Sequence, residues 1–381
     1  MTPARWLSLF FAVYFFGFGT FLPFWSLWLQ GAGAEAEFIG LLLGLGMAAR
    51  CVGNLGIMSR VRSAGHLLPA IRWLGLLSLL VFGAFYGWQT SLGLLVLTLL
   101  ANLVYSSLIP AGEALASRYI VQVQLDYGRA RLWGSAAFIV ASLLVGQLSA
   151  RLGSQWILHT MVLSLVLLLL LSLLPVVPGP AEPAAGQRGD SVWQALCRPG
   201  MGRFLLVTSL LQGSHAFYYG FSSLYWQQQG YDAGTIGYLW GLGVLAEILV
   251  FMFYKRWLGH LTARPLLMAG MICALCRWLL LGATTEPGWL ILAQVLHAGS
   301  FGFTHLGAVR YISSELDGRA VFGGQALYAA VSSGLAPGLL LMASGLLYPW
   351  LQGQTFWLMA LAVLPVAWLL TSPLQRQQVS A

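Results

Sequence analysis

Charged side chains are scarce in this 381-residue chain. Asp, Glu, Lys and Arg together make up 8% of the sequence, whereas soluble domains usually contain roughly 25%. So few charges cannot cover a surface that faces water, and 59% of the residues are hydrophobic. The composition therefore excludes an ordinary soluble globular protein and predicts an integral membrane protein.

Cysteines and enzyme signatures are scarce as well. Cys51, Cys273 and Cys276 fall in apolar segments and Cys197 falls in a polar joint, so none is placed for an extracellular disulfide. A zinc site at Cys273 and Cys276 would need further ligands nearby, which the sequence does not offer. The chain contains neither HExxH nor GxSxG, and no nucleotide-binding motif is evident. We therefore expect no metal, no cofactor and no enzymatic activity.

Apolar segments of about 20 residues, the length that crosses a bilayer as a helix, recur from one end of the chain to the other. They are continuously apolar, unlike the alternating strands of a membrane barrel, and therefore predict helices. The first segment is too long for the core of a signal peptide and is expected to remain in the mature protein. The twelve predicted spans are residues 6–29, 38–58, 67–87, 91–116, 132–150, 155–174, 203–228, 235–254, 265–284, 288–309, 321–345 and 351–371.

The basic residues in the joints are distributed asymmetrically. With twelve spans both termini lie on one side, and the opposite side receives only Arg151. The positive-inside rule then predicts cytoplasmic termini and an inner-membrane location, so the basic pI reflects topology and not nucleic-acid binding. The residues on the side of the termini are Arg5, Arg60, Arg62, Arg72, Arg118, Arg129, Arg131, Arg188, Arg198, Arg203, Lys255, Arg256, Arg264, Arg310, Arg319 and Arg376.

The two halves of the chain are related by an internal repeat. At an offset of 197 residues, Phe24–Gly46 aligns with Phe221–Gly243, and Arg50 falls on Glu247. At an offset of 192 residues a second stretch aligns and pairs Glu113 with His305. Because each half contains six spans, the repeats are parallel. Transporters that rock two bundles about a site at the bilayer midplane share this plan.

A segment rich in Pro, Gly and Ala, PVVPGPAEPAAGQRGD, follows the sixth span. This composition is typical of a linker. The sequence therefore predicts an N-terminal six-helix bundle over residues 1–174, a cytoplasmic linker over 175–202, and a C-terminal six-helix bundle with a short tail over 203–381.

On these features the chain resembles the major facilitator superfamily over essentially its full length. The usual joint between spans two and three is represented by SRVRSAGH, which lacks the family's acid, and this puts the usual gating salt bridge in doubt. Within the superfamily the chain resembles the 3-phenylpropionate (hydrocinnamate) permease group, which is similar to lactose permease and to nucleoside/proton symporters. Proton-coupled uptake is what the resemblance implies. The stretches that carry it are FLPFWSLWLQGAG, LDYGRARLWGSAAF, LQGSHAFYYGFSSLYWQQQGY and RWLLLGATTEPGWLI.

Apart from Arg72 and Arg203, which lie near span ends, the charged residues within the predicted spans are Arg50, Glu113, Glu247 and Arg277. A charge at the centre of a membrane helix costs about 2.5–3.5 kcal/mol on insertion scales, so it usually faces a cavity and has a partner. Three histidines, His215, His297 and His305, lie in the same part of the spans. The charges either form two ion pairs that hold helices together, with Glu113 paired to Arg50, or serve substrate and proton binding. The neighbouring histidines favour the second interpretation.

Glu247 is the favoured proton carrier, with Glu113 as the alternative. Trp240 and Gly243 precede Glu247 at helical spacing and place an aromatic ring, a gap and the acid on one face. The resemblance implies a cluster of an acid on span eight, an arginine on span nine and a histidine on span ten. Glu247, Arg277 and His305 occupy those spans, although Ala308 stands where the related symporters have a second acid.

Substrate binding is predicted for a polar stripe on span seven and for an apolar wall on span one. The stripe contains Gln212, His215, Tyr219, Ser222 and Trp226, and the wall contains Phe15, Phe18, Leu22, Trp25 and Leu29. Facing stripes of this kind would suit a small aromatic acid. Tryptophans near helix ends can instead form an interfacial belt.

The leading functional hypothesis is a secondary active transporter that imports a small aromatic carboxylate, such as 3-phenylpropionate, together with protons. Arg277 is expected to dock the carboxylate because its planar fork can bind two oxygens, with Arg50 as the competing site. His297 is expected to line the same site. The alternative is a proton-coupled transporter of a nucleoside, sugar or drug, including efflux. The expected partners are the small-molecule substrate, protons and the lipid bilayer, with no nucleic acid and no obligate protein partner.

Overall fold

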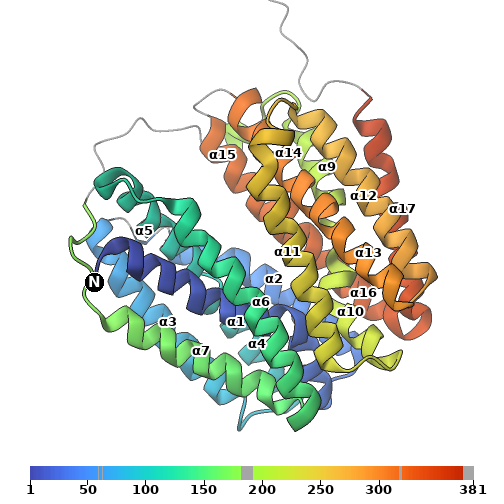
Figure 1. Ribbon diagram of the computed structural model, residues 1–381, viewed down its shortest axis with the longest axis horizontal. Coiled ribbons are helices and arrows are strands. Elements are labelled where there is room, and N and C mark those ends of the chain that lie inside the picture. Colours follow the sequence, from blue (N-terminus) through green and yellow to red (C-terminus); the bar gives the residue numbers. More distant parts are fainter. Residues whose placement is uncertain (59, 62, 182–191, 317–319, 372–381) are drawn as a thin grey trace, which may run out of the picture. The chain divides into compact units, whose positions relative to one another are not determined.

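The computed structural model describes residues 1–58, 60–61, 63–181, 192–316 and 320–371. All regular secondary structure in these ranges is helical (Figure 1), which confirms the predicted all-α fold. Nine of the described helices are long and apolar enough to cross a membrane, and the longest of them, Gly323–Leu369, covers most of the last two predicted spans. The seventh and tenth predicted spans are also helical but interrupted, and the helices therefore account for all twelve predicted spans.

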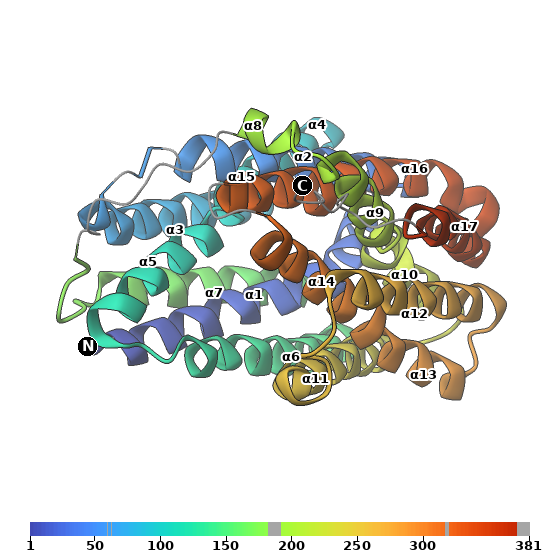
Figure 2. The ribbon, with the colours of Figure 1, turned by 90° about the horizontal axis from the view of Figure 1, so that it is seen from above.

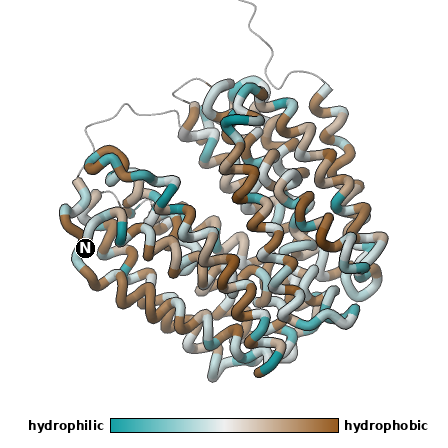
Figure 3. The backbone as a smooth tube through the Cα atoms, viewed as in Figure 1, coloured by the Kyte–Doolittle hydropathy of each residue, from teal (hydrophilic) through white to brown (hydrophobic). Residues whose placement is uncertain are grey.

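The first six predicted spans correspond to helices whose ends lie mostly within a few residues of the predicted ends. Their bounds are α1 (Pro3–Gly31), α2 (Ala36–Met58), η1 (Ala64–His66), α3 (Leu67–Ala84), α4 (Ser91–Tyr105), α5 (Leu108–Val123), α6 (Tyr127–Leu152) and α7 (Gln155–Leu173). Figure 3 shows hydrophobic residues along the length of these helices, as the composition requires.

The remaining helices are divided into more pieces than the sequence predicted. Their bounds are α8 (Val192–Leu196), α9 (Met201–Gly213), α10 (Ala216–Gln228), α11 (Ala233–Trp257), α12 (Ala263–Ala283), α13 (Pro287–His297), η2 (Ala298–Phe303), α14 (Thr304–Arg310), η3 (Tyr311–Glu315), α15 (Ala320–Leu327), η4 (Tyr328–Leu335), α16 (Ala336–Leu351), η5 (Gln352–Gln354) and α17 (Thr355–Leu369). Helix α16 continues six residues beyond the predicted end of its span, with Pro349 inside its last turn.

The helices pack into two compact units. The first unit comprises Met1–Gly186 and Trp226–Gly241, and the second comprises Gln187–Tyr225 and Leu242–Ala381. In the first unit α1 packs against α6 and α7, and α2 packs against α4 (Figures 1 and 2). In the second unit α12 packs against α17, α13 and α14, and α9 packs against η4 and α16. The predicted domain boundaries at 174 and 203 stay predictions.

The beginning of the predicted linker is bound to the first unit. Tyr119 donates its hydroxyl hydrogen to Pro178 O at 3.0 Å. The side chain of Gln122 donates to Gly179 O at 2.9 Å and accepts from Ala181 N at 3.0 Å. These bonds tie residues 178–181 to the end of α5. The following part of the predicted linker, residues 182–191, lies outside the described residues.

Polar side chains cap the N-terminal ends of several helices by accepting hydrogen bonds from backbone N–H groups that have no partner within the helix. Asp126 Oδ1 accepts from Arg129 N at 3.0 Å at the start of α6, and Thr90 Oγ1 accepts from Gly93 N at 3.2 Å at the start of α4. Asp232 accepts from both the backbone N and the hydroxyl of Thr235 before α11. These bonds favour the charged carboxylate and hold the pKa of Asp232 below its usual range.

The fourth predicted span is interrupted between α4 and α5, shortly before Pro110. A proline lacks the N–H that would bond to the carbonyl four residues earlier, and its ring crowds that carbonyl. That carbonyl belongs to Ser106, which with Ser107 forms the turn between the two helices. Both serine hydroxyls donate to Asn54 Oδ1 on α2, at 3.3 and 3.4 Å, so the break is fixed to a neighbouring helix.

The seventh predicted span is also interrupted, which the sequence did not predict. Leu211 O would normally accept from His215 N, but it instead accepts the Ser214 hydroxyl at 2.7 Å and lies 3.0 Å from His215 Nδ1. The backbone N of His215 donates instead to Gln212 O, three residues back where α-helical geometry requires four. Short polar side chains that compete for a backbone carbonyl disrupt helices in this way. The result is a turn between α9 and α10 with His215 at its centre.

The tenth and eleventh predicted spans contain π-helical segments, η2 and η4. In η2 the hydroxyl of Ser300 donates to His297 O at 3.3 Å, and the hydroxyl of Thr304 donates to Ser300 O at 2.7 Å. Side-chain hydroxyls thus bond to carbonyls in the widened helix. π-Helical segments occur frequently at functional sites, and η2 lies next to the histidines described below.

The close packing of α2 against α4 can be tested by mutation. A Cβ at Gly53 would collide with the backbone carbonyl of Leu103, whereas a Cβ at Gly83 would meet no atom within 4 Å. We expect Gly53→Ala to destabilise the protein by about 1–3 kcal/mol, because the rigid backbone must shift. Thermal unfolding in detergent would measure the effect, with Gly83→Ala as a control that leaves stability unchanged or slightly raised. Equal melting temperatures for the two variants would contradict this packing.

Candidate functional site

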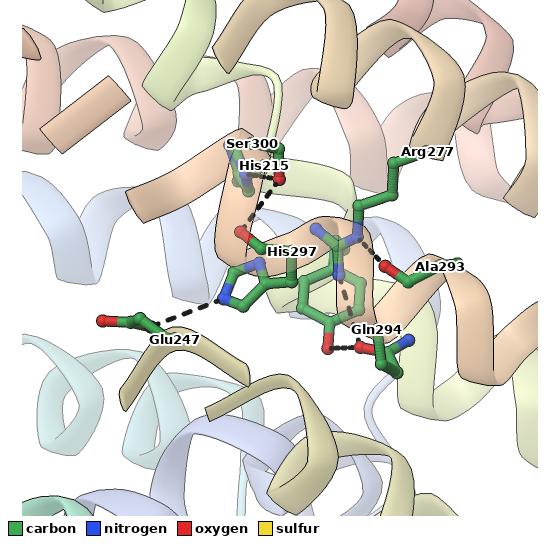
Figure 4. A network of polar contacts seen from close by, with 8 residues as sticks. His215, Glu247, Arg277, Ala293, Gln294, His297 and Ser300 are labelled. Carbon is green, nitrogen blue, oxygen red and sulfur yellow. Dashed lines mark hydrogen bonds and ion pairs between the residues drawn. The ribbon is translucent and has the colours of Figure 1, made fainter. Parts of the chain in front are cut away.

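Glu247 and His297 form the centre of the candidate site in the second unit. Glu247 Oε2 on α11 lies 3.9 Å from His297 Nε2 on α13 (Figure 4), with 22% and 8% of the two side chains exposed. Helix α11 approaches α13 closely here, since a Cβ at Gly243 would meet Gln294 Oε1 at 3.4 Å and His297 Cδ2 at 3.5 Å. Glycine at this position therefore leaves room for the contact between the carboxylate and the imidazole.

Arg277 is fully buried on α12 and is surrounded by neutral groups. Its Nε donates to Ala293 O at 2.9 Å, and its Nη2 donates to Gln294 Oε1 at 3.4 Å. The guanidinium carbon lies 4.0 Å from the centre of the Tyr218 ring and 4.6 Å from that of Trp278. The face of an aromatic ring attracts a cation, so these contacts hold the charge without neutralising it.

The orientation of the Gln294 side chain follows from its partners. Arginine nitrogens only donate hydrogen bonds, so the Gln294 atom that faces Nη2 must be the oxygen. The Tyr218 hydroxyl donates to the same oxygen at 2.8 Å. Among the described residues, Gln294 Nε2, Arg277 Nη1 and His297 Nδ1 are buried without a hydrogen-bond partner. A buried polar atom left unpaired costs about 1–3 kcal/mol, so a ligand or water that reaches these nitrogens would be stabilised.

His215 is fully buried at the break between α9 and α10. Because Leu211 O can only accept, His215 Nδ1 carries a hydrogen. His215 Nε2 lies 3.1 Å from Ser300 Oγ, whose one hydroxyl hydrogen can be donated either to this nitrogen or to His297 O. The ring of His215 also lies against those of Trp278 and His297, with centroids 5.0 and 5.8 Å away. The turn in the helix thus places His215 beside the residues that surround Arg277.

His305 lies on α14, which follows α13 and η2, and its polar neighbour differs from that of His297. Its Nδ1 is 3.5 Å from the Tyr328 hydroxyl, which accepts a hydrogen bond from Gln212 Nε2 at 2.9 Å. The ring of Phe301 is stacked between the two imidazoles, with centroids 5.6 Å from His297 and 6.0 Å from His305. The structure therefore brings His297 next to Glu247 and places His305 near Tyr328 and Gln212.

In the first unit, Glu113 forms an ion pair with Arg131. Glu113 Oε1 lies 3.8 Å from Arg131 Nε, and about a third of each side chain is exposed. The Arg131 guanidinium lies over the Phe15 ring at 3.8 Å. This pair differs from the expected one, since the sequence suggested Arg50 as the partner of Glu113. Arg50 itself is half-buried on α2.

Three predicted aromatic site residues differ in their surroundings. Trp25 is 2% exposed within an aromatic cluster in the first unit, where it stacks on Trp28 at 4.6 Å. Trp240 is buried on the first part of α11. Tyr219 is half-buried on α10, and its ring is stacked on His215 at 5.8 Å. Their roles in substrate binding stay predictions.

The sequence reasoning missed five residues of these networks: Tyr218, Gln294, Ser300, Tyr328 and Arg131. Gln294 carried a usable signal, because a primary amide inside an apolar span must find polar partners in the protein. Arg131 was assigned to a cytoplasmic joint, although α6 begins at Tyr127 and includes it. Serine and tyrosine are common in membrane helices, so Tyr218, Ser300 and Tyr328 carried no distinctive signal.

Comparisons with known proteins agree with this architecture. A family model described as the MFS_1 like family matches residues 4–359. The chain belongs to this family of the major facilitator superfamily. It is 43% identical over 371 residues to a protein of Escherichia coli (strain K12) named "Probable 3-phenylpropionic acid transporter", with 97% of each chain covered. It is also 30% identical to a maltose permease of Geobacillus stearothermophilus, with 91% of this chain and 89% of the permease covered.

A solved structure of the nucleoside transporter NupG has the same fold. Its TM-score is 0.80, with 98% of this chain and 100% of that chain covered, at 14% sequence identity. The family and these relatives are transporters and not enzymes. This member of the major facilitator superfamily is accordingly a multi-pass membrane transporter of a small-molecule substrate.

The Glu113–Arg131 ion pair gives a prediction about stability. Because both side chains are about a third exposed, solvent screens their attraction, and we expect the pair to contribute less than about 1 kcal/mol. A double-mutant cycle with Glu113→Gln and Arg131→Gln, followed by unfolding in detergent, would measure the coupling. A coupling above roughly 2 kcal/mol would show that the pair holds α5 to α6 as a structural lock.

Proposed function

We propose that the protein imports a small aromatic carboxylate together with protons across the cytoplasmic membrane, with both termini in the cytoplasm. The observation that carries this proposal is Arg277, a fully buried cation whose described contacts are all with neutral groups. A buried charge usually has an opposite charge beside it. A substrate anion would supply that charge.

Docking of the carboxylate at Arg277 is supported by the geometry of its guanidinium. Two of its three nitrogens bond to Ala293 O and Gln294 Oε1, which fix the plane of the group. The third, Nη1, is buried without a partner and remains to bind an anion. Docking to a preoriented donor saves the ordering entropy that a flexible side chain would lose. We assign Arg277 as the docking group, with Arg50 as the competing site.

The proton is proposed to reside on the Glu247–His297 pair. At 3.9 Å the two groups are in electrostatic contact, so a proton on either one changes the electrostatic potential at the other. With neutral His297, ionised Glu247 and charged Arg277 sum to zero. A substrate anion would make the set negative, and one added proton restores neutrality. Because net charge in a buried site is costly, binding of the anion favours uptake of the proton.

Two observations support a substrate that contains an aromatic ring. The chain is 43% identical to the protein named "Probable 3-phenylpropionic acid transporter". Aromatic side chains are also concentrated near Arg277, where the Tyr218 and Trp278 rings contact its guanidinium. Aromatic pairs contribute about 0.5–1.5 kcal/mol beyond the area that they bury, which favours a ring over an aliphatic chain. Trp240 and Tyr219 are proposed to contribute in the same way.

A second candidate substrate class is a sugar or nucleoside. The 30% identity to a maltose permease and the structural similarity to a nucleoside transporter favour it. The discriminating experiment is uptake of labelled 3-phenylpropionate, maltose and uridine into vesicles, with and without an imposed pH gradient. Accumulation of the acid alone, driven by an inwardly directed proton gradient, is the expected outcome. Accumulation of maltose or uridine would overturn the proposed substrate.

Removing the charge of Glu247 is expected to separate binding from proton coupling. Glu247→Gln keeps the shape of the side chain but cannot exchange a proton. We expect it to abolish accumulation of 3-phenylpropionate against a gradient while exchange of labelled for unlabelled substrate continues. Vesicle uptake and counterflow assays measure the two activities separately.

Glu113→Gln is the matched control, since Glu113 is paired with Arg131 in the first unit. It is expected to retain accumulation driven by the proton gradient. If Glu113→Gln loses accumulation but keeps exchange, and Glu247→Gln accumulates normally, the roles of the two acids are reversed.

Replacing Arg277 by lysine is expected to weaken binding of the carboxylate substrate more than binding of its neutral amide. Lysine keeps the positive charge but lacks the planar fork that binds Ala293 O, Gln294 and an anion at once. We expect Arg277→Lys to raise the apparent KM for 3-phenylpropionate about tenfold or more, while inhibition by the neutral amide of the same acid changes little. Normal transport by this variant, together with failure of Arg50→Lys, would place carboxylate docking in the first unit.

A further inference from the structure

Gln294 occupies the position from which a side chain could neutralise Arg277. Its oxygen lies 3.4 Å from Arg277 Nη2 (Figure 4). The same oxygen accepts a hydrogen bond from the Tyr218 hydroxyl at 2.8 Å. The residue is fully buried, so water does not screen the interaction. A glutamate has the same length and shape and could accept both hydrogen bonds. The only major difference would be a full negative charge beside the guanidinium.

The consequence of that charge follows from electrostatics in a buried site. A carboxylate hydrogen-bonded to a buried guanidinium forms a strong charge-assisted pair. The arginine would then have little further attraction for an external anion, and a second carboxylate nearby would be repelled. An amide oxygen holds the guanidinium in position by its dipole alone and leaves the net positive charge unbalanced. Arg277 Nη1 consequently remains a charged donor without a partner.

We propose that Gln294 determines the charge specificity of the transport site, by orienting Arg277 with a neutral acceptor where an acid would cancel its charge. This inference rests on the proposed docking of a carboxylate at Arg277. It assigns Gln294 a specificity-determining role through Arg277, and requires no contact between Gln294 and the substrate. The site thereby selects monoanionic carboxylates over their neutral amides and alcohols.

An amide oxygen can accept two hydrogen bonds, and the Gln294 oxygen has two donors beside it. The Tyr218 hydroxyl and Arg277 Nη2 both point to Gln294 Oε1, while the Tyr218 ring lies 4.0 Å from the guanidinium carbon. Tyr218 therefore fixes the amide and contacts the arginine at the same time. These contacts hold Arg277 in one orientation without any contribution from an acidic side chain.

The test compares Gln294→Glu with Gln294→Leu in the full-length purified protein. Glutamate keeps the acceptor and adds the charge, whereas leucine removes the acceptor and adds no charge. Binding of 3-phenylpropionate and of 3-phenylpropionamide would be measured by calorimetry, and stability by thermal unfolding. We expect Gln294→Glu to retain or raise the melting temperature, to lose roughly tenfold or more in affinity for the acid, and to bind the amide as well as the unmodified protein does.

For Gln294→Leu we expect a lower melting temperature and a smaller loss of affinity for the acid. Its melting temperature falls because Tyr218 and Arg277 lose a shared acceptor, and its affinity for the acid falls less than that of Gln294→Glu. It retains the preference for the acid over the amide, because Arg277 is still not neutralised. This second variant keeps the inference testable even if Gln294→Glu does not fold. Loss of the acid preference in Gln294→Leu would overturn it.

Gln155→Glu serves as the matched control. Gln155 Oε1 accepts from Trp28 Nε1 at 3.3 Å on α7 in the first unit, so this variant also keeps an acceptor and adds one negative charge. It is expected to bind the acid normally. Equal acid affinity in Gln294→Glu and the unmodified protein would mean that Gln294 acts only in packing. If the unmodified protein binds uridine or maltose but no carboxylate, the proposed function fails instead, and the two failures are therefore distinguishable.

Discussion

Backbone groups inside a bilayer have no water to bond to, and this constraint determines how the structure is built. Every carbonyl and N–H in the membrane must find a partner within the protein, which is why helices form all the regular structure of the described residues. Where a helix is interrupted, side chains take over the bonding. Ser214 and His215 occupy Leu211 O at one break, and Ser106 and Ser107 bond to Asn54 at another. The same substitution of side chain for backbone brings polar groups into the otherwise apolar interior.

The two charged residues of the candidate site, Arg277 and Glu247, are held by polar groups of this kind. Arg277 is held by Ala293 O, a buried carbonyl of α13, and by an amide and two aromatic rings. Glu247, in contrast, faces the ionisable ring of His297. One charge is thus placed in a setting that cannot change its protonation, and the other beside a group that can. This division suits a site that must bind an anion firmly while it gains and loses a proton.

The sequence was sufficient for much of the fold because the relevant physics is local. Runs of apolar residues predicted the helices and their order. The break at Ser214 was missed because it depends on which donors reach Leu211 O, which composition does not determine. Pairing within the site was missed for a related reason. Without the rotation of each helix about its axis, Glu113 could be matched to Arg50 as readily as to Arg131, and Glu247 to His305 as readily as to His297.

The stacking of Phe301 between His297 and His305 has a mechanical consequence. The three rings follow one another at four-residue intervals, with interplanar angles of 22° and 1°, and so form a continuous stack along one side of the helix. A rotation of this helix would therefore move the three rings together. If the helix rotates about its axis, the contact of His297 with Glu247 and that of His305 with Tyr328 must change in the same step. The two polar contacts are therefore coupled to one motion of the helix, although no bond joins them.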